Sequence, residues 1–188
     1  MTIIILLLFL LLVLVILFVV FSELIAFLRT RVPFVPTHAG DIEFIVKKLG
    51  ITSADTFYDL GSGNGKVVFL VSKLSGATCV GFELGWWTVL FAKIKAHIRP
   101  PLPLGEGRGE GLNRIEFKNQ NFFKADWSGA NYIYGYLYPP LMARVEAKFL
   151  ADCKPGSIAI IRDFPLPNLP HTDKFYLPKK HEIYIYKK

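Results

Sequence analysis

The chain has 188 residues, of which 52% are apolar, a mean hydropathy of +0.38 and a formal net charge of +7. The apolar excess is local, because 25 of the first 28 residues are apolar while the remaining 160 are about 46% apolar, an ordinary value for a globular domain. The composition therefore excludes a multi-span membrane protein and a disordered chain.

The apolar segment runs from Ile3 to Phe21, with 19 consecutive residues that lack a polar side chain. As a helix it would be about 28 Å long, close to the ~30 Å hydrocarbon layer of a bilayer. A removed signal peptide would have basic residues before this run and small residues after it, and a buried core helix would carry a polar stripe. We expect residues 1–28 to form a single membrane anchor and residues 29–188 to form one domain. Arg29 and Arg31 follow the span directly, which predicts a domain on the cytoplasmic side.

Residues 29–188 carry 22 Lys and Arg against 14 Asp and Glu. This surplus suits a domain beside an anionic membrane surface, and it equally suits a generic solvated surface. The cations are scattered rather than gathered in a stripe, so no nucleic-acid partner is expected. Cys79 and Cys153 have apolar neighbours and predict reduced core cysteines, and the sequence has no Cys-x-x-Cys spacing, so no metal is expected. The four histidines are scattered along the chain.

The domain alternates helices and strands. Ile42, Ile45, Val46 and Leu49 repeat at helical spacing before Gly50, which predicts an amphipathic helix. Further helices are predicted over 65–74, 86–98 and 140–153, and strands over 55–59, 78–82, 115–117, 132–137 and 157–162. Residues 174–176 and 182–188 predict a terminal antiparallel pair. We expect a Rossmann-like, doubly wound α/β fold with a mostly parallel, seven-stranded sheet.

Two further expectations concern the helix over 86–98 and the segment after it. Trp86 and Trp87 are interpreted as the buried face of that helix. The segment 100–112 is Pro-rich and then Gly-rich, which predicts a low-complexity loop insertion. Because it joins a helix to a strand, it should lie at the edge of the sheet opposite to the ligand site.

The most informative segment is Asp59-Leu60-Gly61-Ser62-Gly63-Asn64-Gly65-Lys66, where the first strand turns into a helix. Glycines allow positive φ and a close approach of a ligand, and the start of the helix offers unpaired N–H groups. A dinucleotide fingerprint would need a glycine at position 66, and a P-loop would need Ser or Thr after the lysine. Neither is present, so both classes are excluded.

Glu83 ends the second predicted strand, 18 residues after Gly65. A carboxylate in this place can accept hydrogen bonds from both ribose hydroxyls of an adenosine. With Asp59 and the three glycines, it predicts a pocket for an adenosine-containing cofactor. The alternative is that Asp59 and Glu83 only cap their strands.

The segments D-L-G-S-G-N-G-K and G-F-E-L resemble motif I and the ribose acid of class I, seven-strand S-adenosylmethionine-dependent methyltransferases. Four segments of the region 33–187, namely 33–37, 81–87, 117–124 and 162–167, resemble the small membrane-anchored protein-lysine methyltransferases related to those of mitochondria. That family places a hydrophobic segment before its catalytic domain and modifies lysines of membrane proteins. The resemblance implies S-adenosyl-L-methionine as the cofactor and a protein substrate with an accessible lysine.

The resemblance also assigns roles to residues of this sequence. The methionine end of the cofactor would lie on the glycine turn with its ammonium steered by Asp59, the ribose on Glu83, and the adenine beside Asn121. The predicted cofactor-binding set is Asp59, Gly61, Ser62, Gly63, Gly65, Glu83, Leu84, Asn121 and Phe122. Asn121 stands where the family usually has Asp, and a plain turn residue is the alternative interpretation. Gly85-Trp86 replaces the usual Asn-Pro, and Asp163 is inserted at the substrate rim.

Methyl transfer from a sulfonium needs alignment and a dry pocket, and a lysine acceptor must first lose its proton. Tyr138 with Pro139, at the end of the fourth strand, is the predicted wall for the acceptor, and Asp163 is a candidate for orienting the amine. A strand end followed by a proline that starts a helix explains Tyr138 and Pro139 equally well. The leading hypothesis is a membrane-anchored methyltransferase that acts on lysine of a membrane-associated protein. A small-molecule or lipid methyltransferase and a non-catalytic cofactor-binding scaffold are the alternatives.

Overall fold

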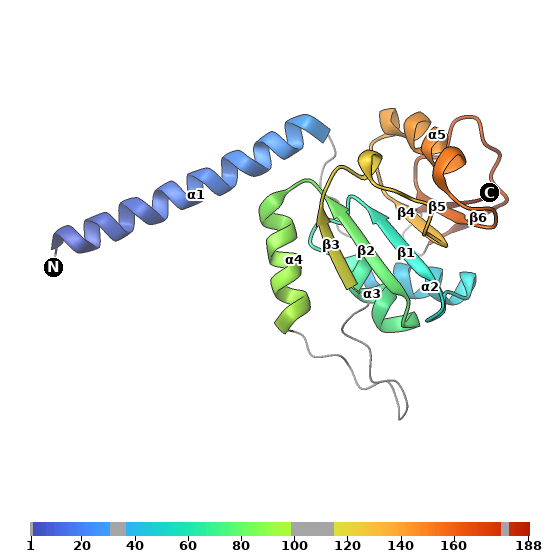
Figure 1. Ribbon diagram of the computed structural model, residues 1–188, viewed down its shortest axis with the longest axis horizontal. Coiled ribbons are helices and arrows are strands. Elements are labelled where there is room, and N and C mark those ends of the chain that lie inside the picture. The colour runs from blue at the N-terminus through green and yellow to red at the C-terminus, as the bar shows by residue number, and fades with distance from the viewer. Residues whose placement is uncertain (1, 31–36, 99–114, 178–180) are drawn as a thin grey trace, which may run out of the picture.

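The computed structural model describes residues 2–30, 37–98, 115–177 and 181–188. Arg31 and the predicted insertion 100–112 lie outside these described residues. Helix α1 (Thr2–Thr30) projects from a body in which helices cover a single sheet (Figure 1). The helical run of apolar residues predicted from Ile3 to Phe21 lies within α1, with most of its side chains exposed.

The sheet has seven strands, as predicted, in the order β3-β2-β1-β4-β5-β7-β6. The four pairings among β1 to β5 are parallel, and β7 is antiparallel to both β5 and β6. The predicted terminal pair therefore extends the sheet, with the last strand inserted between β5 and β6. The strands are β1 (Thr56–Leu60), β2 (Thr78–Glu83), β3 (Ile115–Asn119), β4 (Tyr132–Gly135), β5 (Ile158–Arg162), β6 (Asp173–Tyr176) and β7 (Glu182–Lys187).

Helices cover both faces of the sheet, which confirms the doubly wound arrangement. One core joins the sheet to α2 (Ala39–Leu49), α3 (Lys66–Ser75) and α4 (Trp86–Ile98), and the other joins it to α5 (Met142–Asp152). Two short turns of 3-10 helix, η2 (Phe122–Lys124) and η3 (Pro139–Leu141), follow β3 and β4. Both turns therefore lie at the carboxyl ends of parallel strands, which is the edge of the sheet where ligands bind in doubly wound folds.

Local sequence explains where the helices begin and end. Gly50 and Gly76 end α2 and α3 with φ of 65° and 71°, a conformation that favours glycine. Cys79 and Cys153 are buried and free, one in each core, as the sequence predicted.

A buried ion pair joins α2 to β5. Arg162 Nη2 lies 3.1 Å from Asp41 Oδ2, and the two side chains are 1% and 4% exposed. The guanidinium also lies 4.8 Å from the ring centroid of Tyr136, which follows β4. Because both charges are out of water, each needs compensation, and Arg162 Nε also lies 3.9 Å from Asp163 Oδ2. The pair therefore fixes α2 over the carboxyl end of β5.

The interpretation of Trp86 and Trp87 as the buried face of their helix is wrong. The packing face of α4 is formed by Val89 and Ala92, which are 3% and 1% exposed, whereas Trp86 is 49% exposed. Residues two positions apart on a helix point in nearly opposite directions, so Trp87 faces away from the sheet when Val89 faces it. Trp87 is half-buried and contacts Phe18 of α1 instead.

Candidate active site

The glycine turn connects β1 to α3 at the carboxyl edge of the sheet. Gly61, Gly63 and Gly65 have φ of 80°, 51° and 76°. The N–H groups of Gly61 and Ser62 both donate to the carbonyl of Phe82 at 2.9 Å, which ties the turn to β2. A side chain at Gly65 would come within 2.3 Å of the Phe117 ring. The shape of the turn therefore requires glycine.

Glu83 holds the turn and the start of α4 together. Its Oε2 accepts from the N–H of Gly63 at 3.0 Å, and its Oε1 accepts from the N–H groups of Leu84 and Gly85 at 2.7 and 2.9 Å. The capping interpretation is thus confirmed for this carboxylate. Each carboxylate oxygen has two lone pairs, so Oε2 retains one for a further donor such as a ribose hydroxyl.

Asp59 is the unusual group of the site. Its side chain lies in the buried part of β1, where the residue is 3% exposed, and its Oδ2 has no hydrogen-bond partner among the described residues. Burial, with a smaller contribution from the Glu83 carboxylate, raises the pKa of Asp59 to about 8. The Ser62 hydroxyl in the same turn is also buried without a partner in the described chain.

Unsatisfied buried polar groups are rare, and two of them at one glycine turn indicate a polar ligand. The ammonium of a methionine moiety can donate to Asp59, and a ribose hydroxyl can donate to Glu83. The residues of the turn therefore fit S-adenosylmethionine, with donors on the ligand where the protein offers acceptors.

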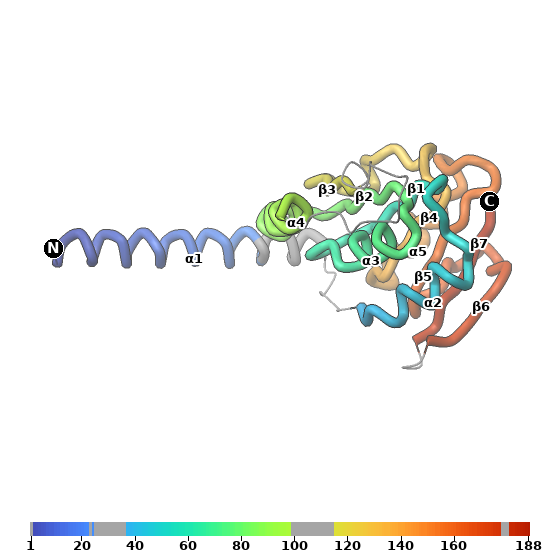
Figure 2. The backbone as a smooth tube through the Cα atoms, turned by 90° about the horizontal axis from the view of Figure 1, so that it is seen from below, coloured from blue at the N-terminus to red at the C-terminus, as the bar shows by residue number. Residues whose placement is uncertain are grey.

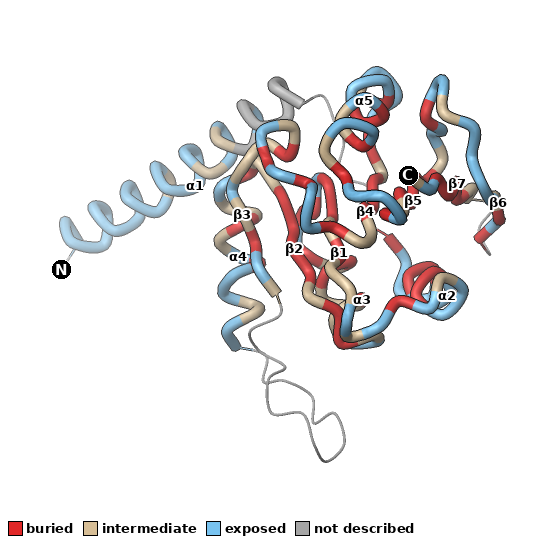
Figure 3. Tube along the Cα trace, turned by 45° about the vertical axis from the view of Figure 1, so that its right-hand side comes forward, coloured by how far each residue is buried: buried red, intermediate tan, exposed pale blue. Residues whose placement is uncertain are grey.

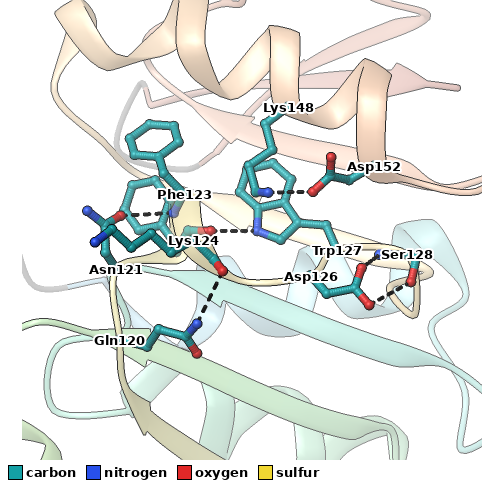
Figure 4. A network of polar contacts seen from close by, with 10 residues as sticks. Gln120, Asn121, Phe123, Lys124, Asp126, Trp127, Ser128, Lys148 and Asp152 are labelled. Atoms are coloured by element: carbon teal, nitrogen blue, oxygen red, sulfur yellow. Dashed lines mark hydrogen bonds and ion pairs between the residues drawn. The ribbon is translucent and has the colours of Figure 1, made fainter.

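Asn121 caps η2 (Figure 4). Its Oδ1 accepts from the N–H of Phe123 at 2.9 Å, and the indole of Trp127 donates to the carbonyl of Phe122 at 2.9 Å. The turn interpretation of Asn121 is confirmed, and its contact with adenine stays a prediction. Sequence reasoning missed Asn119, whose amide donates to the carbonyls of Glu83 and Leu84. Its position at the end of β3, the strand next to β2, could have predicted that it lies beside Glu83.

The predicted acceptor wall follows β4. This strand ends at Gly135, two residues earlier than predicted, and Leu137 then packs against the glycine turn, where a side chain at Gly61 would meet it at 3.3 Å. Tyr138 is 42% exposed and precedes η3, with Pro139 in the first turn. The interpretation of Pro139 as the start of a helical turn is confirmed, and the acceptor role of the pair stays a prediction.

Asp163 is held in place by several groups beyond the end of β5. Its φ of 62° is positive, which is true of no other non-glycine residue in the described ranges. Its Oδ1 accepts from the N–H of Glu182 at 2.9 Å, and its Oδ2 lies 2.8 Å from His181 Nδ1. Burial and a hydrogen bond to Asp163 raise the pKa of Tyr136. Sequence reasoning missed His181, because only the antiparallel return of β7 brings it to Asp163.

Residues 59–173 match the family model described as the ANTKMT methyltransferase domain. The match covers more than half of the chain and spans the elements from the glycine turn to β6. This chain belongs to that family.

Curated relatives of this family member carry the names of lysine methyltransferases. It is 28% identical over 137 residues to a lysine N-methyltransferase of Homo sapiens that is named for a subunit of ATP synthase, covering 72% of this chain and 53% of that protein. It is 24% identical over 140 residues to the adenine nucleotide translocase lysine N-methyltransferase of Mus musculus, covering 74% and 56%. The chain thus spans about half the length of these relatives. A protein-lysine N-methyltransferase of Saccharolobus islandicus (strain REY15A) is 24% identical over 165 residues, covering 80% of this chain and 96% of the relative.

Solved structures confirm the fold of the methyltransferase domain. An RNA methyltransferase from Salinibacter ruber in complex with S-adenosyl-L-homocysteine aligns with a TM-score of 0.70 and 24% identity, covering 81% of this chain and 93% of that one. A methyltransferase from Geobacter sulfurreducens with the same ligand aligns with a TM-score of 0.54 and 18% identity, covering 68% and 49%. Together with the family match, these findings confirm the predicted class I methyltransferase fold.

Proposed function

We propose that this chain is an S-adenosylmethionine-dependent methyltransferase that modifies lysine of a membrane-associated protein. The observation that carries the proposal is the buried, unpartnered carboxyl group of Asp59 beside Glu83 at the glycine turn. The names of the relatives support the lysine acceptor, because three of them are lysine methyltransferases and two are named for ATP synthase and for the adenine nucleotide translocase.

The cofactor supplies a methyl group on a sulfonium, which is already activated for transfer. The chain binds and orients it. Asp59 accepts from the ammonium, Glu83 accepts from the ribose, and the glycine turn brings bare backbone against the ligand. Leu84, Asn121 and Phe122 lie next to Glu83 in sequence or across β3, and they form the adenine side in this proposal.

The acceptor lysine approaches from the end of β4. The exposed ring of Tyr138 and the neighbouring Pro139 can cover the amine and remove water from it, which lowers an amine pKa and frees its lone pair. Asp163 is fixed by His181 and by the backbone of Glu182, so its carboxylate can orient groups at the rim without moving itself. We assign Tyr138 and Pro139 to the acceptor wall and Asp163 to orientation of the amine.

The anchor is the third part of the proposal. The helical segment Thr2–Ser22 has a hydropathy of 3.9 and none of it is buried against the domain, which supports a single span. We assign residues 1–28 to the anchor and 29–188 to the methyltransferase domain. Arg29, at the end of α1, and Arg31 support a domain on the cytoplasmic side of that membrane.

The test is transfer of a labelled methyl group by the full chain to isolated membranes. The label is expected in protein and not in extracted lipid, and prior acetylation of membrane lysines is expected to abolish it, because an amide nitrogen has no free lone pair to accept a methyl group. Label in the lipid fraction would support the lipid methyltransferase. Normal binding of S-adenosylmethionine with no label in either fraction would support the scaffold.

A further inference from the structure

Helix α4 carries an exposed apolar stripe on the side that faces away from the sheet. It consists of the half-buried Trp87 and the exposed Phe91, Ile94 and Ile98, which recur at intervals of four, three and four residues and so share one side of the helix. Phe91, Ile94 and Ile98 are 62%, 44% and 70% exposed. Figure 3 shows exposed stretches along α4. Val89 and Ala92 form a second apolar side, which packs on the sheet. A surface helix of a soluble domain needs only one such side, so the α4 stripe requires an occupant.

Basic residues border the stripe on both sides. Lys93 and His97 are exposed along one border, and Lys95 lies along the other with its ammonium 4.7 Å from the centroid of the Phe69 ring. An apolar stripe between cationic borders is typical of a helix that lies in the headgroup region of an anionic bilayer. The basic surplus of residues 29–188 has the sign that such a surface attracts.

The stripe is continuous with the span of α1. The rings of Phe18 and Trp87 lie 6.5 Å apart at 81°, edge to face. Phe18 is sixteen residues after Thr2, about 24 Å along a helix, so this contact lies near the end of the hydrocarbon-spanning part of α1. Tryptophan is enriched at this depth. Figures 1 and 2 show α4 running across the direction of α1.

We propose that α4 is a second, interfacial membrane contact, which inserts its stripe into the headgroup layer of an anionic bilayer next to the α1 span. The inference rests on the proposed anchoring by α1, and it adds that the domain docks on the membrane in one orientation. The bilayer is the occupant because the stripe begins at the contact with the span and is bordered by cations.

Docking in this orientation places the active site near the bilayer. Trp86 begins α4 only three residues after Glu83, and the amides of Leu84 and Gly85 between them bind the Glu83 carboxylate. Glu83 therefore lies close to the start of the helix that contacts the bilayer. The acceptor class that this geometry favours is a lysine within a few residues of a bilayer surface.

The test uses the full chain in vesicles of phosphatidylcholine and phosphatidylglycerol, with an environment-sensitive fluorophore attached at Phe91→Cys. Leu150→Cys is the matched control, because Leu150 is also an apolar helical residue, 43% exposed, on the α5 face of the sheet. Background labelling is low because the native cysteines are buried. The probe at position 91 is expected to shift to the blue and to be quenched by brominated lipid, and the probe at position 150 is expected to do neither.

Carbonate extraction of the same vesicles separates the two proposals. If the chain resists extraction and binds S-adenosylmethionine while the probe at position 91 behaves like the probe at position 150, docking by α4 is wrong and the proposed function stands. If carbonate releases the chain, the anchor is wrong. If the blue shift disappears when each vesicle holds a single chain, the stripe contacts a second copy of the chain, and the proposed contact with the bilayer is wrong.

A functional readout complements the probe. Phe91→Glu with Ile94→Glu is expected to lower methylation of membrane-embedded acceptor severalfold and to leave cofactor affinity unchanged, whereas Leu150→Glu changes neither. Equal methylation of membranes by both variants would contradict docking by α4.

Discussion

At the scale of single residues, the protonation of Asp59 has a measurable consequence for cofactor binding. Its pKa of about 8 means that the free protein holds a neutral carboxyl group at pH 7. An ammonium pairs with the ionised form, so binding at pH 7 is expected to release close to one proton. Affinity should then increase as the pH rises from 6 toward 8, because less work is needed to ionise Asp59, and level off above that pH.

Calorimetry of S-adenosylhomocysteine binding in buffers of different ionisation enthalpy measures the released proton. Asp59→Asn has no carboxyl proton to lose, so its binding should be weaker and independent of buffer. A wild-type protein that releases no proton at pH 7 would show that the cofactor ammonium does not pair with Asp59.

Glu83 gives a second prediction at this scale. Glu83→Ala is expected to weaken cofactor binding by about 10- to 100-fold, the equivalent of roughly 1.5 to 3 kcal/mol for hydrogen bonds to a charged group. Glu116→Ala is the control, because Glu116 is an exposed acid on the neighbouring strand β3. Equal affinities of the two variants for the cofactor in a calorimetric titration would show that Glu83 does not bind it.

Sequence reasoning found the residues whose roles depend on local chain order. The glycines of the turn and Glu83 follow consecutive strands, so their convergence follows from the topology of a parallel sheet. His181 contacts Asp163 and the Tyr136 ring through side chains that follow or precede β4, β5 and β7. No spacing in the sequence predicts such contacts. Asn121 shows the same limit, because the sequence allowed a cap and an adenine contact and only the folded chain reveals the cap.

At the scale of elements, the ion pair between α2 and β5 predicts an unequal response to two substitutions on one helix. Asp41→Ala leaves the buried Arg162 charge with only its longer contact to Asp163, 3.9 Å from Nε, and is expected to cost about 3 to 5 kcal/mol of unfolding free energy. Lys47→Ala breaks a pair with Glu43 in which the side chains are 73% and 50% exposed, and it should cost less than about 0.5 kcal/mol. Urea unfolding of both variants measures the difference, and similar midpoints would contradict it.

The strands and helices were predicted correctly in kind and order, because alternating and helical spacings of apolar residues report directly on burial. The buried face of α4 was predicted wrongly because that prediction also used only the spacing of apolar residues. Periodicity identifies an apolar side but not its occupant, and this helix has one apolar side toward the sheet and another toward α1. A helix with two apolar sides therefore cannot be oriented by assuming that every apolar residue packs in the core.

At the scale of the whole molecule, the anchor and the catalytic body are expected to be separable. Deletion of residues 1–28 should leave affinity for S-adenosylmethionine unchanged, because the site is built from residues between β1 and β7. Methylation of a membrane-embedded acceptor should fall, because the anchor raises the effective concentration of enzyme at its substrate. Parallel assays of cofactor binding and of label transfer to membranes measure both effects. Loss of cofactor binding on deletion would mean that α1 is part of the site.

The short connection between Glu83 and Trp86 also has a thermodynamic consequence. The four residues from Glu83 to Trp86 end β2 and begin the helix with the exposed stripe, so the proposed cofactor site and the proposed contact with the bilayer act on one piece of backbone. Any energetic coupling between two binding events must be reciprocal. The factor by which vesicles change the dissociation constant of the cofactor must therefore equal the factor by which the cofactor changes the partition coefficient of the domain between water and membrane.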